Sequence, residues 1–204
     1  MYFSKISTIG LEQFSDYVIH QKLFEIFTKS IDRKFIYVRE DTAIYLYSLE
    51  KPGTSSFFPV VKTKEMKANF DKGVLLEFKV KFNPVLRVYN KTTGKKQKRD
   101  LIEHSRIMLK EKGVFKTDKD ISKDILEDWF KKKESDFGFS VLQTNSVYNY
   151  QKEEFRSRKI TFKSITFEGV LKVTNTELFQ KVLELGIGTS KGFGFGLIFI
   201  KNVK

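Results

Sequence analysis

Near its end the chain contains Gly186-Ile187-Gly188-Thr189-Ser190-Lys191-Gly192-Phe193-Gly194-Phe195-Gly196, a glycine-rich loop followed by the apolar run Leu197-Ile198-Phe199-Ile200. Five glycines in eleven positions let the backbone approach a ligand where a Cβ atom would collide, and Lys191 adds a positive charge among them. Residues 176–185 predict a helix before the loop, with Asn175 as its N-cap, and the apolar run predicts a strand after it. Loops that bind dinucleotides or nucleoside triphosphates lie between a strand and a helix, so both ligand classes are excluded.

The composition indicates a folded chain with a polyanionic partner. Of 204 residues, 40% are hydrophobic and 21 are Phe, which is enough to build a sizeable core. Residues 1–80 hold 12 Lys and Arg against 10 Asp and Glu, whereas residues 81–204 hold 26 against 15. Positive charge concentrated in one part favours a nucleic acid. A lysine-rich proteome would not leave the first part nearly neutral, and no amphipathic helix typical of binding to an anionic lipid surface is evident.

Residue counts exclude several kinds of site. The chain has no Cys, which excludes disulfides, thiolate metal sites and a Cys nucleophile. Its only histidines are His20 and His104, which disfavours a His-rich zinc site, so we expect no metal and no cofactor. The N-terminal residues lack the apolar region of a signal peptide, and no apolar run approaches membrane-spanning length. We expect a cytoplasmic protein with no membrane partner and no small-molecule ligand.

The order of the expected elements predicts an α+β fold of two tandem ferredoxin-like (RRM-like) βαββαβ domains. Strands are expected at 2–7, 35–39, 43–48, 60–61, 74–88 with a break at 83–84, 140–150 and 160–173, and helices at 11–28, 121–134 and 176–185. The first domain is expected at 1–83 and carries the catalytic helix. The second is expected at 84–204, opens with Val85–Val88, and holds a basic hairpin and the C-terminal glycine-rich loop. Residues 90–99 are rich in Lys and predict a basic loop.

Tyr17 and His20 are the candidate catalytic residues. The helix expected at 11–28 has an apolar stripe that faces the sheet, formed by Ile19, Leu23, Ile26 and Phe27. Tyr17 and His20 lie about 60° from each other on the flank of this stripe, at the border between core and solvent. A border histidine that only hydrogen-bonds locally, with Tyr17 as an ordinary core-edge residue, would explain the same pattern.

If the chain cleaves RNA, these two residues suit one route to that reaction. Without Cys or a metal cluster, the simplest nucleophile is the RNA's own 2′-hydroxyl, which attacks the adjacent phosphorus. A histidine with a pKa near 6.5 can take a proton from that hydroxyl or give one to the departing 5′ oxygen. Tyr can orient the nucleophile or donate a hydrogen bond, and Lys or Arg can hold the phosphate. We expect His104 to be a solvated surface residue.

Two further basic clusters stand out. Arg156, Arg158 and Lys159 lie in the charged tip between the strands expected at 140–150 and 160–173. On an antiparallel ribbon they would lie along a phosphate backbone or against guanine edges, although a solvated hairpin end is the alternative. The run Lys131-Lys132-Lys133 ends a helix, where positive charge favours the helix dipole, so it needs no functional explanation.

Together these motifs resemble those of the CRISPR-repeat endoribonucleases, and within them the CasE family of repeat-RNA-processing subunits of the type I-E Cascade complex. The glycine-rich loop and the Tyr17-x-x-His20 spacing carry the resemblance. Further landmarks occur in the same order at Met1–Lys5, Val61–Lys64, Phe82–Pro84 and Phe167–Leu171. The resemblance therefore covers nearly the whole chain.

This resemblance implies a function and a set of site residues. It implies two ferredoxin-like domains and metal-independent cleavage of CRISPR precursor RNA at the base of the repeat hairpin, leaving a 2′,3′-cyclic phosphate and a 5′-hydroxyl. Tyr17 and His20 take the places of the family's active-site pair. The tip with Arg156, Arg158 and Lys159, together with Lys191, is expected to bind the RNA. The subunit is expected to stay on the mature guide RNA with the other Cascade subunits; a non-catalytic module that binds the RNA hairpin is the alternative.

Overall fold

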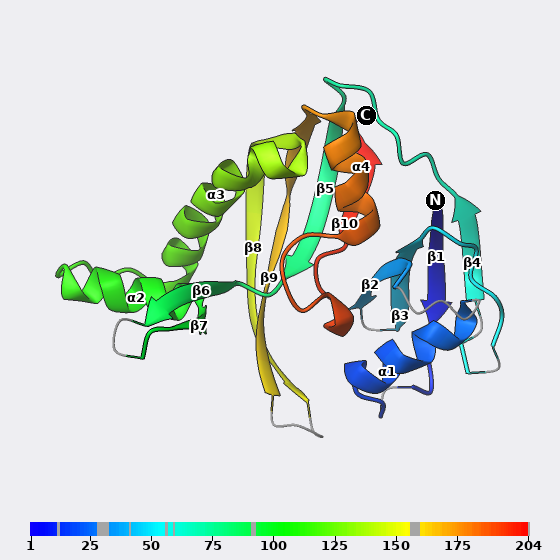
Figure 1. Ribbon diagram of the computed structural model, residues 1–204, viewed down its shortest axis with the longest axis horizontal. Coiled ribbons are helices and arrows are strands. Elements are labelled where there is room, and N and C mark those ends of the chain that lie inside the picture. The colour runs from blue at the N-terminus through cyan, green and yellow to red at the C-terminus, as the bar shows by residue number, and fades with distance from the viewer. Residues whose placement is uncertain are drawn as a thin grey trace.

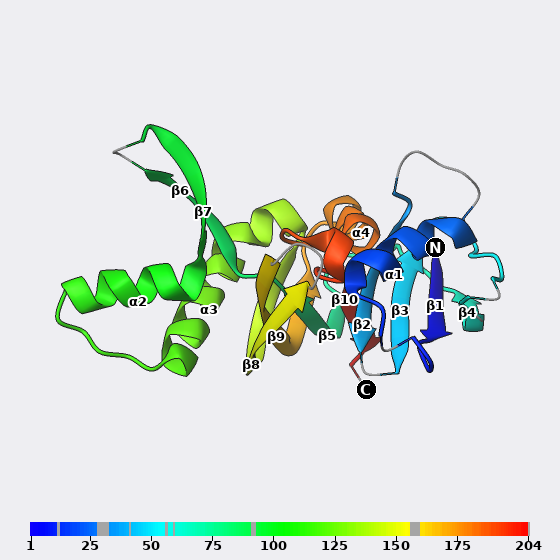
Figure 2. The same ribbon diagram turned by 90° about the horizontal axis from the view of Figure 1, so that it is seen from below.

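Two units lie side by side in the computed structural model, and an arm extends beyond the second (Figures 1 and 2). Each unit is built round a four-stranded antiparallel sheet. The structure describes residues 1–203 except 12, 28–32, 41, 56, 59, 91–92 and 156–159. At 60–61, 86–87, 90, 125–127, 145–155 and 160–163 it describes the backbone alone.

The first unit has its strands in the order β2-β3-β1-β4. Its elements are β1 (Tyr2–Ser7), α1 (Asp16–Leu23), the 3₁₀ turn η1 (Phe24–Ile26), β2 (Phe35–Glu40), β3 (Ala43–Ser48) and β4 (Val60–Glu65). α1 is shorter than expected because the Ser15 side chain caps it, accepting a hydrogen bond from the Val18 amide. Between β3 and β4 the described residues form no second helix, so this unit is a βαβββ variant of the ferredoxin-like arrangement.

The second unit is a complete βαββαβ unit with the strand order β10-β5-β9-β8. Its elements are β5 (Leu75–Phe82), α3 (Asp118–Phe137), β8 (Phe139–Phe155), β9 (Ile160–Val173), α4 (Thr176–Leu185) and β10 (Ile198–Asn202). Asn175 caps α4 as expected, accepting a hydrogen bond from the Leu178 amide. The glycine-rich loop joins α4 to β10 and contains the 3₁₀ turn η2 (Lys191–Phe193). The predicted α+β class and ferredoxin-like units are confirmed.

The strand that opens the second sheet differs from the prediction. β5 is hydrogen-bonded to β9 and to β10, so it is the first strand of the second unit. The expected opening strand, Val85–Val88, was wrong because that segment, as β6 (Val85–Asn90), pairs with β7 (Lys95–Asp100). A division after residue 83 would leave β5 outside its own sheet. We therefore propose to place the boundary in the segment 66–74, between β4 and β5.

Residues 95–99 of the expected basic loop belong to a strand, β7 (Lys95–Asp100), and residues 93–94 form the turn before it. β6 and β7 form a separate two-stranded ribbon, followed by α2 (Leu101–Glu111), which leads into α3. Ribbon and α2 are inserted between β5 and α3, and Figure 2 shows them projecting from the second unit. The pairing of β7 with β6 could not be predicted, because β7 consists only of polar and charged residues and carries none of the apolar alternation typical of a strand.

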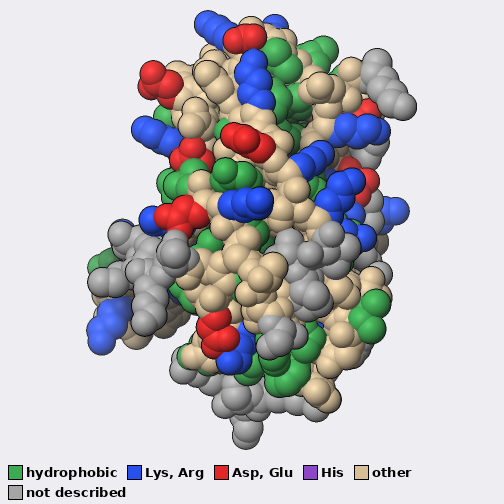
Figure 3. Space-filling view, turned by 90° about the vertical axis from the view of Figure 1, so that its right-hand side faces the viewer, with side chains coloured by type: hydrophobic (Ala, Val, Ile, Leu, Met, Phe, Trp, Pro, Cys, Tyr) green, Lys and Arg blue, Asp and Glu red, His purple; other side chains and the backbone are tan. Residues whose placement is uncertain are grey.

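At β2 both faces of the first sheet are buried, which places α1 and the second unit on opposite sides of this strand. From β2, Phe35 and Tyr37 pack toward α1, whereas Ile36 and Val38 pack into the core of the second unit. On the face of the first unit shown in Figure 3, Lys and Arg side chains are interspersed with Asp and Glu, in agreement with its nearly neutral charge. Across the described residues, no helix is both long and apolar enough to cross a membrane.

Candidate active site

α1 is held against β2 by a half-buried ion pair at its first turn. Arg39 Nη1 lies 3.1 Å from Asp16 Oδ1 and donates a hydrogen bond of 3.0 Å to the Phe14 carbonyl. Asp16 also favours the helix dipole at this end. These contacts fix how α1 crosses the sheet and therefore where the side chains of its second turn point.

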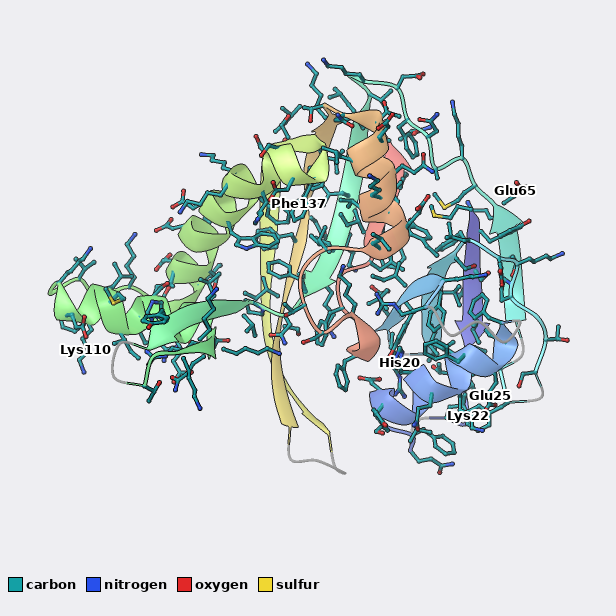
Figure 4. The ribbon with its side chains drawn as sticks, in the orientation of Figure 1. His20, Lys22, Glu25, Glu65, Lys110 and Phe137 are labelled. Carbon is teal, nitrogen blue, oxygen red and sulfur yellow. The ribbon has the colours of Figure 1, made fainter. Side chains whose placement is uncertain are left out.

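His20 is half-buried among aromatic rings. Its imidazole stacks on the Tyr37 ring, with centroids 5.9 Å apart and planes 19° apart, and meets the Phe24 ring edge-on at 5.2 Å. Figure 4 shows His20 between α1 and η2, whereas Lys22 and Glu25 lie on the outer side of the helix. Nδ1 is buried and has no hydrogen-bond partner among the described residues. Proton exchange by this imidazole therefore goes through Nε2.

The glycine-rich loop approaches His20 through Gly192. A Cβ atom on Gly192 would lie 3.2 Å from His20 Nε2, closer than ordinary van der Waals contact. The Tyr37 hydroxyl donates a hydrogen bond of 2.9 Å to the Gly192 carbonyl across 155 positions of sequence. Tyr37 thus holds both parts of the site: its ring supports the imidazole, and its hydroxyl fixes the loop.

Other glycines of the loop serve its own packing. A Cβ atom on Gly186 would collide with the Ile36 side chain and the Gly196 carbonyl, and Gly186 has a φ of 69°. Lys191 Nζ donates a hydrogen bond of 2.8 Å to the Gly186 carbonyl, which closes the loop on itself. The close backbone approach that the glycines predicted is therefore present. Among the described residues, the atoms that the loop approaches belong to the protein itself.

Three basic groups meet at this corner. Burial lowers the pKa of His20, and the positive charge of Arg33 lowers it further. Burial also lowers the pKa of Lys191, with a second contribution from Arg33. Arg33 itself stays charged at neutral pH, although burial lowers its pKa. The site thus combines an imidazole that is mostly neutral at pH 7 with a positive potential suited to a phosphate.

Tyr17 faces the same loop as His20. Its ring packs with Phe193 and Phe195, immediately after Gly192, and its hydroxyl accepts a hydrogen bond of 3.2 Å from Gln21 Nε2. The two candidate side chains therefore both border residues 192–195, one through a glycine and the other through two aromatic rings.

The remaining predicted site residues fall in three places. Lys191 lies at the site, whereas Arg156, Arg158 and Lys159 lie outside the described residues. His104 is half-buried rather than solvated as expected, and its helix, α2, lies on the far side of β8 and β9 from α1 (Figures 1 and 2). In the described part of the chain, no group of three His, Asp or Glu side chains could hold a metal ion.

Arg33, Tyr37 and Gly192 were not predicted as site residues. Tyr37 lies in β2 and Arg33 just before it, and their role depends on interactions with residues far along the chain. Gly192 carried a signal, because it lies beside Lys191 in a loop whose glycines predicted close approach.

Comparisons with known proteins cover the whole chain. The model of a family described as CRISPR associated protein matches residues 1–202. The CRISPR system Cascade subunit CasE of Escherichia coli (strain K12) is 26% identical over 208 residues, which cover 97% of this chain and 98% of that protein. The crystal structure of the CRISPR-associated protein Cas6e from Escherichia coli K-12 is similar at a TM-score of 0.71, with 20% identity and 100% of both chains covered. Thermus thermophilus Cse3, bound to an RNA representing a pre-cleavage complex, is similar at a TM-score of 0.70, with 18% identity and 98% of both chains covered.

Proposed function

The chain belongs to the family of CRISPR associated proteins, and from that premise we propose that it is an endoribonuclease that processes CRISPR repeat RNA. The membership inferred from the glycine-rich loop and the Tyr17-x-x-His20 spacing is confirmed by the family match. One relative is a Cascade subunit, and another was captured with an RNA before cleavage. We infer the same substrate class here, a repeat hairpin, and the other Cascade subunits as partners.

The observation that carries the proposal is the environment of His20 Nε2. This nitrogen lies beside a residue with no side chain, on a ring whose pKa is lowered by burial and by Arg33. A neutral imidazole can accept a proton at pH 7, whereas an imidazolium cannot. Of the two proton-transfer roles open to a histidine, the lowered pKa therefore favours the general base.

In the proposed reaction, His20 Nε2 takes the proton from a ribose 2′-hydroxyl. The 2′ oxygen then forms a bond to the adjacent phosphorus, and the bond from phosphorus to the 5′ oxygen breaks. The departing 5′ oxygen takes a proton from solvent and becomes a 5′-hydroxyl. The other product ends in a 2′,3′-cyclic phosphate, and no metal ion takes part.

The cations at the site stabilise the charge that builds up on phosphorus. Arg33 contributes positive potential at His20 and at Lys191, which lies in the loop that borders His20, and a fixed positive group is worth most where water is partly excluded. We assign Tyr17 a hydrogen bond to the departing oxygen, because its ring is positioned by the loop that borders His20. Arg156, Arg158 and Lys159 keep their proposed role in gripping the stem.

The test is cleavage of a repeat hairpin in EDTA. The wild-type protein should yield a product with a 2′,3′-cyclic phosphate, and a single 2′-deoxy substitution 5′ to the cut should abolish cleavage while leaving binding intact. Tight binding without product, even in protein excess, would instead identify the non-catalytic hairpin-binding module. Equal competition by a scrambled hairpin would indicate a general binder of double-stranded RNA.

A further inference from the structure

The β6–β7 ribbon has no part in the proposed active site and is not required by either sheet. β6 and β7 pair only with each other among the described strands. A two-stranded ribbon is only marginally stable by itself in water, and this one extends neither four-stranded sheet. The hydrogen bonding of the two sheets therefore does not explain the insertion. In Figures 1 and 2 it lies on the other side of β8 and β9 from α1.

β7 carries a run of exposed positive charge. Lys95, Lys96, Lys98 and Arg99 are all exposed, and none forms an ion pair with a described residue. The one acidic residue of β7, Asp100, caps α2 by accepting a hydrogen bond of 2.8 Å from the backbone amide of Glu103. Four cations on six residues repel one another in the free protein, and a bound polyanion would relieve this repulsion.

An exposed aromatic ring lies on the same ribbon. The register pairs Tyr89 with Lys96, and opposite residues of an antiparallel pair share a face. Lys98, two residues further along β7, lies on that face as well. Tyr89 is 59% exposed, with its hydroxyl toward the turn, 3.7 Å from where a Cβ of Gly94 would lie. The face therefore offers a flat ring beside two ammonium groups.

This combination selects unpaired nucleotides. Ammonium groups bind phosphates of any nucleic acid, but an exposed ring gains its energy by stacking on a base whose face is open. Bases inside a duplex are already stacked on their neighbours and leave only grooves and backbone to a protein. We propose that the β6–β7 ribbon binds single-stranded RNA away from the cut site. We take this RNA to be the strand that flanks the repeat hairpin, a step that rests on the proposed function.

The experiment compares binding of two fluorescent RNAs by the full-length protein: a single-stranded 12-nucleotide oligouridylate and a blunt 12-base-pair duplex. Tyr89→Leu should weaken binding of the oligouridylate about tenfold, the usual size of a missing base–aromatic stack, and Tyr89→Phe should keep most of the affinity. The double substitution Lys96→Ala with Lys98→Ala should also weaken binding of the oligouridylate. It should reduce the slope of log Kd against log salt by about 0.7 for each phosphate that the protein no longer neutralises.

Two exposed lysines on α3 provide a matched control. Replacing Lys131 and Lys132 together with Ala removes the same charge from a helix, and should leave most of the affinity for the oligouridylate. Unchanged binding by the ribbon variants, equal losses for Tyr89→Phe and Tyr89→Leu, or a loss as large for the duplex would overturn the inference. None of these results depends on cleavage, so failure of the proposed nuclease activity would be seen separately in the hairpin assay.

Discussion

Replacing Gly192 with Ala should slow RNA cleavage without unfolding the protein. The φ of Gly192 is outside the left-handed region, so Ala can adopt its backbone conformation. The added methyl group would lie 3.2 Å from His20 Nε2 and 3.5 Å from Cε1, where ordinary contacts begin at 3.4 Å, so the imidazole must shift by a few tenths of an ångström. Because a displacement of about 1 Å can cost about a hundredfold in rate, this shift, with the methyl group shielding Nε2, should cost about tenfold.

The assay is single-turnover cleavage of the repeat hairpin, with hairpin affinity and the urea unfolding midpoint measured on the same preparations. Gly188→Ala in the same loop is the control. Gly188 has a φ of 73°, and the nearest atom to its Cβ position is 3.9 Å away. Its replacement should therefore lower stability by about 1 kcal/mol and leave cleavage by the folded protein nearly unchanged. Full activity of Gly192→Ala, or equal effects of the two substitutions on rate, would refute the placement of Nε2 against the loop.

Other predictions concern the same corner of the molecule. Burial and Arg33 lower the pKa of His20 from 6.5, so the cleavage rate should rise with pH to a plateau, with a midpoint below 6.5. A rate that falls with pH through this range would assign His20 as the general acid instead. Tyr37→Phe keeps the ring but removes the hydrogen bond to the Gly192 carbonyl. Urea unfolding should show that the free energy of unfolding falls by about 1 kcal/mol, and cleavage should slow severalfold. Unchanged stability and rate would show that Tyr37 does not support the site. Gly186→Ala should destabilise by about 3 kcal/mol because its methyl group collides with Ile36, and a thermal shift of less than a degree would contradict this packing.

The repeated order of strands and helices made the fold predictable, while pairing partners were harder to predict. β1, β3 and α4 begin and end where the apolar patterns indicated. β5 was assigned to the wrong unit because a strand's sequence does not reveal which sheet it joins. α2 was missed although Asp100, followed by Glu103, is a recognisable helix start.

The candidate catalytic pair was predictable because both residues lie on one short helix, where spacing alone sets their relative direction. Tyr37 and Arg33 were not, because their part in the site comes from the fold: the Tyr37 hydroxyl reaches a residue 155 positions away. Burial of the imidazole also lowers its pKa, a property that the sequence pattern does not contain. The basic ribbon was noticed as charge, but its alternating faces required the strand register.

Replacing His20 with Ala is the most direct test of the proposed proton transfer. In EDTA, single-turnover cleavage of the repeat hairpin should fall by at least about a hundredfold, the usual contribution of a general base, while the Kd for the hairpin stays within about twofold. Lys22→Ala, on the outer side of the same helix, should cut at nearly the wild-type rate. Cleavage by the His20→Ala variant at the wild-type rate would show that another group moves the proton.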